Sequence, residues 1–218
     1  MKLISVNVGR PRLVHVNGET ASTAIYKDPV TGPVHVARLN LDGDRQADLN
    51  VHGGVNKAVY GYPLEHYEFW RERYPDFPWQ WGAFGENLTV EGLREETLHV
   101  GDQVAIGSVL LTVTQPRTPC FKLGIKLGTN RILKEFLESG RSGFYFSVTQ
   151  EGKLEAGDEI GVIPAGHEQI TIAEANHLIT AKSVPSELLN RALGSASLSA
   201  NWREHFREKF GADAPAND

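Results

Sequence analysis

The chain has 218 residues, of which 40% are hydrophobic and 22% are charged. This composition fits one domain, or one domain with a small appendage, and excludes a wholly disordered chain. The formal net charge of -5 argues against a protein that coats nucleic acid, because phosphate binding needs a basic surface. The single cysteine, Cys120, excludes an internal disulfide and any metal site built from several cysteines.

The N-terminal residues 1–10 contain an apolar stretch that is too short and too interrupted for a signal peptide. No run in the sequence approaches the roughly 18 apolar residues that a membrane helix needs. We therefore expect a cytoplasmic protein without a membrane partner, and a single cysteine agrees with a reducing compartment.

The first half of the chain is rich in strand signals. The pair Asn17-Gly18, next to an apolar stretch, predicts a β-hairpin. Tyr67, Trp70 and Tyr74 recur at helical spacing and predict a helix over residues 65–73. Alternating apolar residues predict strands over residues 3–8, 13–16, 34–39, 57–62 and 87–90.

Two segments of the middle region, residues 98–106 and 154–162, resemble each other. Each places a Gly-Asp pair in a tight turn before a strand of alternating residues. Short strands with such corners favour a closed or partly closed barrel over a sheet of parallel strands joined by helices. One helix is predicted inside this region, over residues 130–139, with Gly140 ending it.

Three short helices are predicted after residue 166. A capping box from Thr171 to Glu174 opens the first helix, which extends to about residue 181. The second covers residues 185–193 and ends at Gly194. The third is predicted by apolar residues four positions apart, which are Leu198, Trp202, Phe206 and Phe210. Because three short helices make a small core, we expect them to dock on the barrel.

Residues 103–134 contain no aspartate or glutamate, although the whole chain is acidic. The basic residues of this window are Arg117, Lys122, Lys126, Arg131 and Lys134. Cations near a thiol favour its thiolate form, which is the nucleophilic and metal-binding form, and they attract anionic ligands. The alternative is that Cys120 is a small buried hydrophobic residue, as many lone cysteines are.

The residues that precede Cys120 favour the first interpretation. Pro116 and Pro119 follow a predicted strand over residues 109–114, and proline stops a strand because it lacks a backbone donor. We therefore expect Cys120 on a stiff loop at the end of a sheet, where side chains are better placed for chemistry than for core packing.

The segment from His52 to Lys57 contains a second candidate site. Gly53 and Gly54 allow backbone amides to approach a ligand closely, while His52 and Lys57 offer a hydrogen-bond donor and a cation. A plain Gly-Gly turn with a solvated lysine explains the same residues. The spacing does not match a zinc site, and a nucleophilic pair of Cys120 with His52 stays open.

Two further glycine-bearing loops complete the candidate segments. Residues 82–87 lack the strand and helix that flank a dinucleotide-binding or phosphate-binding loop. Residues 140–143, which include Arg141, form a cationic turn or a helix stop with a surface arginine.

Six segments in order carry a resemblance to a known family. They are residues 23–34, 43–49, 52–60, 84–89, 116–123 and 140–145, and they include Lys27, Gly53-Gly54 and the Pro-Cys pair at 119–120. Together they resemble the MOSC family, the domain found at the C-terminus of molybdenum cofactor sulfurases. The resemblance is closest to stand-alone bacterial members of the YiiM type, which carry a three-helix C-terminal appendage.

The resemblance implies a mainly β fold with helices, an irregular bent β-barrel of the PK β-barrel type. It implies a MOSC domain over residues 1–166, a three-helix subdomain over residues 167–211 and a flexible tail over residues 212–218. It also implies the pyranopterin molybdenum cofactor as ligand and, at family level only, pyridoxal phosphate binding.

The site residues are carried over from the same resemblance. Cys120 is the expected molybdenum ligand, with Lys27 and Arg117 beside it as catalytic residues. The expected cofactor-binding residues are His52, Gly53, Gly54, Lys57, Asn87 and Arg141. Asn56 stands where an aspartate is expected, which leaves the role of position 56 open.

The implied activity is the reduction of N-hydroxylated bases such as 6-hydroxylaminopurine, a detoxification reaction. The sequence shows no flavin, haem or iron–sulfur motif, so electrons are expected from a separate reductase. The alternative is that Cys120 carries a persulfide, or that the domain binds and delivers the cofactor. A third interpretation, a buried thiol with no cofactor, also stays open, as do the physiological substrate and the oligomeric state.

Overall fold

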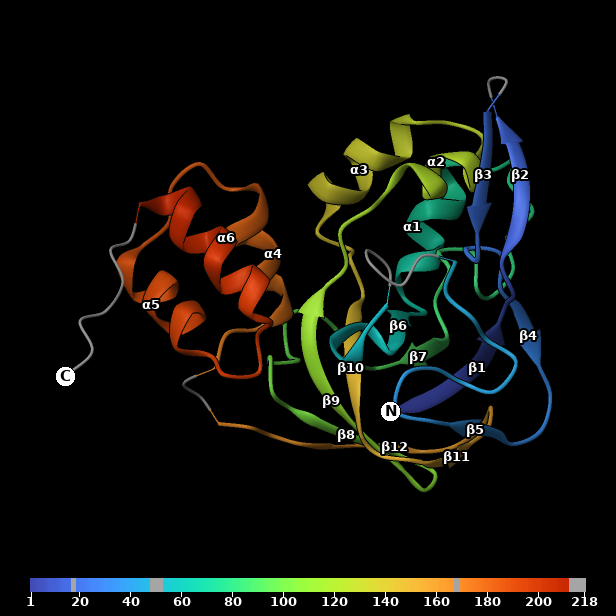
Figure 1. The fold of residues 1–218 in the computed structure, drawn as a ribbon, viewed down its shortest axis with the longest axis horizontal. Coiled ribbons are helices and arrows are strands. Elements are labelled where there is room, and N and C mark those ends of the chain that lie inside the picture. Colours follow the sequence, from blue (N-terminus) through green and yellow to red (C-terminus); the bar gives the residue numbers. More distant parts are fainter. Residues whose placement is uncertain (17–18, 48–52, 167–168, 212–218) are drawn as a thin grey trace.

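The structure is a computed structural model that describes residues 1–16, 19–47, 53–166 and 169–211 (Figure 1). The strands are β1 (Lys2–Val8), β2 (Arg12–Val16), β3 (Glu19–Thr23), β4 (Asp28–Val30), β5 (Val34–Val36), β6 (Val59–Pro63), β7 (Leu88–Glu91), β8 (Gln103–Ile106), β9 (Val109–Pro116), β10 (Phe144–Gln150), β11 (Gly152–Leu154) and β12 (Ile160–Ile163). The helices are η1 (Val55–Lys57), α1 (His66–Arg73), α2 (Phe121–Leu127), α3 (Arg131–Ser139), α4 (Ile172–Thr180), α5 (Ser186–Gly194) and α6 (Ala200–Phe210).

A strongly bent sheet of eight strands forms the body of the molecule, in the order β12-β8-β9-β10-β6-β7-β1-β4. All neighbouring strands are antiparallel except β6 and β7. Backbone bonds from Leu3 to Asp158 and from Ile160 to Met1 bring the start of β1 against the chain that enters β12. The two sides of the sheet therefore meet, and the predicted irregular bent barrel is confirmed.

The two segments that resemble each other in sequence also pair in space. β8 follows Gly101-Asp102, β12 follows Gly157-Asp158, and the two strands are antiparallel neighbours with Ile106 opposite Ile160. Gly101 and Gly157 have φ angles of +95° and +104°, a backbone conformation that residues other than glycine rarely adopt. The corners predicted from the Gly-Asp pairs are thus real turns.

Most predicted elements are confirmed, with shifted ends. The predicted hairpin is present as the antiparallel pair β2 and β3, while its turn residues 17–18 lie outside the described residues. The strand predicted over 57–62 begins later, because residues 55–57 form the 3-10 helix η1. The strand predicted over 34–39 ends at Val36.

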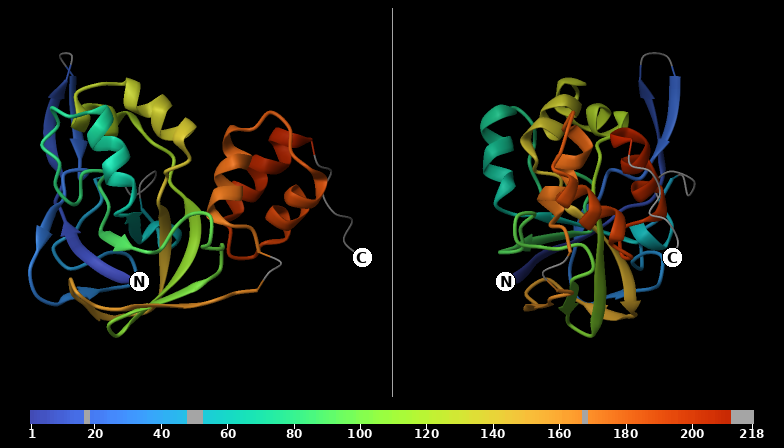
Figure 2. Two further views of the ribbon diagram at one scale, coloured as in Figure 1. Left: turned by 180° about the vertical axis from the view of Figure 1, so that it is seen from behind. Right: turned by 90° about the vertical axis from the view of Figure 1, so that its left-hand side faces the viewer.

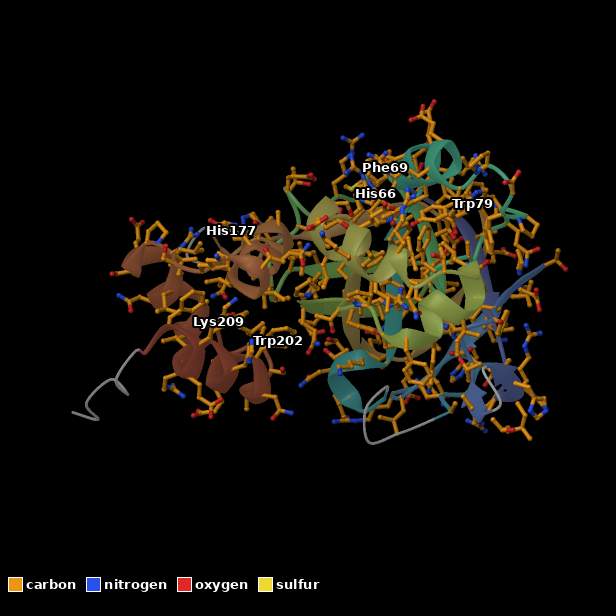
Figure 3. All side chains as sticks on the ribbon, turned by 90° about the horizontal axis from the view of Figure 1, so that it is seen from above. His66, Phe69, Trp79, His177, Trp202 and Lys209 are labelled. Atoms are coloured by element: carbon orange, nitrogen blue, oxygen red, sulfur yellow. The ribbon has the colours of Figure 1, made fainter. Side chains whose placement is uncertain are left out.

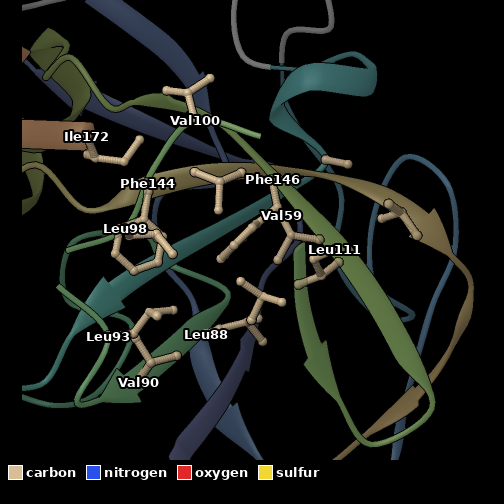
Figure 4. Packing of buried hydrophobic residues seen from close by; sticks show 14 of the residues in the cluster. Val59, Leu88, Val90, Leu93, Leu98, Val100, Leu111, Phe144, Phe146 and Ile172 are labelled. Carbon is tan, nitrogen blue, oxygen red and sulfur yellow. The ribbon is translucent and has the colours of Figure 1, made fainter. Parts of the chain in front are cut away.

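The interior of the bent sheet is the main hydrophobic core. Phe144 and Phe146 alternate inward along β10 and lie among Val59, Leu88 and Leu111 of neighbouring strands (Figure 4). All five side chains are fully buried. Burial of this apolar surface supplies the main driving force for the fold.

A second, aromatic core joins α1 and α3 to the other face of the sheet. The ring of Tyr62 on β6 stacks on Phe84 with centroids 4.3 Å apart, and Trp70 of α1 stacks on Phe136 of α3 at 6.0 Å. The indole of Trp70 donates to the hydroxyl of Tyr62 at 2.7 Å, so the one polar atom of each ring is satisfied.

The helices α4, α5 and α6 lie together at one side of the barrel (Figure 2). The capping box predicted from Thr171 and Glu174 is present. Backbone hydrogen bonds from Ile172 to Leu98 and from Val100 to Ile170 attach the start of α4 to the barrel. Leu178 and Phe206 belong to the same hydrophobic cluster as the barrel core. The expectation that these helices dock on the barrel is confirmed. The predicted division at residue 166 stays a prediction.

Candidate functional site

A cavity opens at the end of β9, where the chain passes from the sheet into α2. The space between its walls, with the open mouth included, is about 660 Å³. Five basic residues line it, against one acidic residue, Asp44. The basic residues are Lys27, Arg45, Lys57, Arg117 and Lys122. We call it the Arg117 cavity. Its excess of positive charge favours an anionic ligand.

Two tyrosines on neighbouring strands line the Arg117 cavity. Tyr60 of β6 is paired with Tyr145 of β10, and their ring centroids are 5.1 Å apart. Because side chains alternate along a strand, Tyr145 faces away from Phe144 and Phe146, which fill the core. Burial raises the pKa of both tyrosines above the ordinary value, so both stay protonated at neutral pH.

Arg117 is a buried cation held by aromatic rings. Its Cζ lies 4.8 Å from the ring centroid of Tyr60 and 5.5 Å from that of Phe136, and its Nη1 donates to Tyr60 Oη at 3.4 Å. Burial acts to lower the pKa of Arg117, but the negative charge that ionised Tyr60, Tyr145 and Cys120 would carry raises it above its ordinary value. Among the described residues no carboxylate forms an ion pair with Arg117. The guanidinium is therefore ready for an anion from outside the chain.

Lys27 differs from Arg117 because it has an acidic partner. Its Nζ donates to Asp44 Oδ1, and the two side chains are 9% and 1% exposed. Asn87 Nδ2 donates to Asp44 Oδ2 at 2.9 Å, and the backbone of Gly9 donates to Oδ1 at 2.9 Å. Burial lowers the pKa of Lys27 and the charge of Asp44 opposes that shift. Lys27 is thus fixed in position, and Asn87 both lines the cavity, as predicted, and holds Asp44.

Cys120 lies in the loop of residues 117–120 that follows β9, as the sequence predicted, and it directly precedes a helix. It is the N-cap residue of α2, a helix that the sequence analysis did not predict. The side chain is half-buried, so it is neither part of the core nor fully exposed. Cys120 also lines a second cavity, described below. A half-buried thiol on the wall of a cavity agrees with the prediction that Cys120 is reactive or binds a metal, which stays a prediction.

The basic window around Cys120 separates into two groups in space. Arg117 and Lys122 line the Arg117 cavity, and Lys126 lies behind it, donating to the carbonyls of Ile25 and Gly82 at 3.0 and 2.6 Å. Arg131 and Lys134 instead form ion pairs along the exposed face of α3. Their partners are Glu135 and Glu138, four residues further on. Only the first part of the basic window, with Arg117 and Lys122, therefore contributes positive charge to the wall of the cavity.

The remaining predicted cofactor-binding residues do not all come together. Lys57 lines the Arg117 cavity, whereas Gly53 and Gly54 line the second cavity. Arg141 lies elsewhere: its Cζ is 3.8 Å from the ring centroid of Phe69, and it borders a separate pocket between α1, α3 and α4. His52 lies outside the described residues.

Three residues of the cavity were not predicted as functional. Asp44, Tyr60 and Tyr145 occur in the segments that carry the family resemblance, but their roles follow from the fold. A signal did exist for the tyrosines, since each alternates with core-facing residues on its strand and carries a polar tip. Asp44 gave no such signal, because its partner Lys27 is 17 positions away in the sequence.

The donor set of this cavity fits the implied molybdenum cofactor. A thiolate is a soft ligand suited to a metal already bound by dithiolene sulfurs. Buried Arg117 and half-buried Lys122 suit a phosphate group. In the part of the chain that the structure describes, no cluster of three His, Cys, Asp or Glu residues forms a separate metal site. A metal that arrives with its own sulfur ligands needs no such cluster.

Fold and site together define the class: a β-barrel protein with a helical C-terminal unit and one thiol beside a cation-lined cavity. The MOSC domain model matches residues 48–161, and the model of the YiiM-like, 3-alpha helix domain matches residues 170–209. The chain belongs to the MOSC domain family. None of its described helices is both long and apolar enough to cross a membrane.

Similar proteins agree with this membership. Protein YflK of Bacillus subtilis is 38% identical over 207 residues, which cover 95% of this chain and 93% of YflK. The crystal structure of YiiM from Geobacillus stearothermophilus shares 35% identity and has a TM-score of 0.79, covering 95% of this chain and 98% of YiiM. A protein of Gibberella moniliformis named Reductase is 35% identical over 86% of this chain, which is 34% of that longer protein.

Proposed function

We propose that this chain binds the pyranopterin molybdenum cofactor in the Arg117 cavity, with Cys120 as a ligand of molybdenum, and reduces N-hydroxylated bases such as 6-hydroxylaminopurine. The observation that carries the proposal is that the single thiol and five basic side chains line one cavity. Membership of the MOSC family supports the cofactor, and similarity to a protein named Reductase supports the reaction type.

Several charged and polar residues of the cavity have roles in this proposal. Arg117 and Lys122 neutralise the phosphate of the cofactor, and Lys27, held by Asp44, adds a fixed positive charge. Tyr145 Oη keeps its proton at neutral pH, because burial raises its pKa, and so remains a hydrogen-bond donor to a bound ligand.

The bound cofactor supplies the two-electron redox chemistry, while the protein supplies ligation and positioning. In the overall reaction the N–O bond of the hydroxylamine breaks, two electrons and two protons are taken up, and the products are the amine and water. A separate reductase provides the electrons.

The test is molybdenum and pterin analysis of the protein purified from a cofactor-producing host, beside its Cys120→Ser variant. We expect close to one molybdenum per chain in the parent protein and a loss of at least tenfold in the variant, together with loss of 6-hydroxylaminopurine reduction. Lys134→Met is the control, because this lysine lies on the exposed face of α3. Full molybdenum content and full reduction in Cys120→Ser would refute the ligand role.

One observation favours a second function, sulfur transfer or cofactor delivery. Cys120 lines two cavities, so a sulfur atom carried on its Sγ is open to approach from a second side. Sulfur that cyanide releases from the parent protein but not from Cys120→Ser, in a preparation without turnover, would favour this function over reduction.

A further inference from the structure

A second cavity lies between the barrel and the helical unit, next to Cys120. Residues of α6, among them Trp202 and His205, form one wall, and Gly53-Gly54 and Gln115 line the barrel side. We call it the Trp202 cavity. Figure 3 shows Trp202 on the side of the helical unit that faces the rest of the chain. The C-terminal helices therefore contribute side chains to a cavity that the family's barrel forms only in part.

The two cavities share a wall. Four residues line both of them, which are Lys57, Thr118, Cys120 and Tyr145. A ligand in the Trp202 cavity therefore also borders Cys120. Under the proposed function, the cofactor occupies the Arg117 cavity, and the Trp202 cavity is the remaining space beside the same thiol.

Trp202 is placed to present a flat apolar surface. Its indole is half-buried, packed on Phe206 with centroids 5.2 Å apart and against His205 at 5.5 Å. These contacts hold the ring in one orientation on α6. Stacking of a base on an aromatic side chain depends on such a fixed face and tolerates any base, because every base has a π-face.

Gln115 adds a polar side chain to the cavity that Trp202 lines with an apolar ring. It is 3% exposed and lines the Trp202 cavity from the barrel side. It is the cross-strand neighbour of Tyr145, so it extends the row of side chains from Tyr60 through Tyr145 into the Trp202 cavity. A glutamine amide offers one donor side and one acceptor side, which match the paired acceptor and donor on the edge of an adenine-like ring.

We propose that the Trp202 cavity binds the planar heteroaromatic base of an N-hydroxylated substrate, with Trp202 stacking on the ring and Gln115 reading its polar edge. This inference rests on the proposed function for the position of the reacting N–OH group beside Cys120. Within the substrate class of the proposed function, it assigns the site that binds the base, and it gives the helical unit a role in specificity.

The test measures equilibrium binding of adenine and of 6-hydroxylaminopurine by calorimetry without electron donor, so that no turnover occurs. We expect Trp202→Leu, which can still pack on Phe206 but cannot stack, and Gln115→Leu each to weaken binding about tenfold or more. Trp202→Phe retains a ring and should bind within about threefold of the parent protein. The controls are Trp79→Phe, since Trp79 lines neither cavity, and Gln150→Leu on the exposed end of β10.

The outcomes separate this inference from the proposed function. Weaker purine binding with unchanged molybdenum content in Trp202→Leu supports the inference, as does purine binding that persists in Cys120→Ser. Unchanged purine binding in both Trp202→Leu and Gln115→Leu overturns it, and so does a parent protein that binds neither purine. N-Cyclohexylhydroxylamine, an aliphatic hydroxylamine, should bind at least tenfold more weakly than 6-hydroxylaminopurine, and equal binding of the two also overturns it.

Discussion

Lys27 and Asp44 form a buried ion pair at the edge of the Arg117 cavity, although 17 residues separate them in sequence. The carboxylate accepts hydrogen bonds from Lys27, Asn87 and the backbone of Gly9, so both of its oxygens are satisfied. The pair keeps one cation at a fixed place in the cavity without leaving a buried charge uncompensated.

Replacing Asp44 by asparagine should destabilise the protein by about 3–5 kcal/mol at pH 7, because it leaves the charge of Lys27 buried without its partner. Loss of Asp44 removes a contribution that raises the pKa of Lys27, so that pKa falls further and the lysine becomes neutral more easily. The loss of stability should therefore shrink as pH rises. Urea unfolding at pH 7.0 and 9.5 measures both effects. Asp42→Asn, an exposed neighbour, is the control, and equal stability of Asp44→Asn and the parent protein would contradict this account.

Arg117 should govern anion binding. At a phosphate concentration about 100 times its dissociation constant, a bound anion stabilises the native state by about 2.7 kcal/mol. For a chain of this size that corresponds to roughly 5–10 °C in the melting temperature. We expect Arg117→Gln to lose most of this increase. Melting in phosphate and in chloride at equal ionic strength measures it.

The control for Arg117 is Arg131→Gln, since Arg131 pairs with Glu135 on α3 outside the cavity. Phosphate also stabilises proteins by exclusion from their surface, so the difference between the two variants is the relevant quantity. The same phosphate-dependent increase in both variants would show that Arg117 does not bind the anion.

Lys126 should make stability depend on pH above neutrality. Burial lowers its pKa to about 8. Below pH 8 the folded chain must keep this buried lysine charged, whereas between pH 8 and about 10.5 the unfolded chain binds more protons than the folded chain. The free energy of unfolding should therefore rise with pH in that window, by up to about 3 kcal/mol from this residue.

The Lys126→Met variant should show a smaller rise between pH 7.5 and 9.5 in urea unfolding. Some rise should remain, because burial also lowers the pKa of Lys27 and of Lys57. Lys134→Met, on the exposed face of α3, should keep the full pH dependence. A Lys126→Met variant with the same slope as the parent protein would refute the assignment.

Gly143 should tolerate no side chain. It has a φ of +63°, and a Cβ atom there would lie 2.5 Å from the carbonyl oxygen of Gly61 and 2.8 Å from the rings of Tyr60 and Tyr62. Gly157 also has a positive φ, at +104°, but a Cβ there meets nothing within 4 Å. We expect Gly143→Ala to cost about 3 kcal/mol or more and Gly157→Ala only about 1 kcal/mol. Equal losses of stability in chemical denaturation would show that the cost at Gly143 comes from backbone conformation and not from crowding.

Local patterns predicted much of the secondary structure. The capping box at Thr171, the stop at Gly140 and the strand predicted over residues 3–8 depend on local patterns, and all three are present in the structure. The short helix α2 was not predicted, because the two prolines before Cys120 indicate a loop and its seven residues give too little periodicity.

The candidate site was predicted less completely than the fold. Cys120, Lys27, Arg117 and Lys57 line one cavity, as expected from the family resemblance, whereas Arg141 lies beside Phe69 in another pocket. The basic window of the sequence also overstates the local field, because Arg131 and Lys134 pair with glutamates that follow them on α3. A helix turns successive side chains to different faces, so charge density along a sequence is not charge density in space.

The sequence by itself determined the number of thiols, the three C-terminal helices, the tight turns and the family, because these follow from composition, local patterns and ordered motifs. Only the tertiary structure decided which charges are buried and paired, that Tyr60, Tyr145 and Gln115 form one row across three strands, and that Trp202 of the last helix lies near the single cysteine. Those relations depend on strand register and helix docking, which join residues far apart in the chain. The sequence therefore shows that there is one cysteine, and the fold determines which side chains surround it.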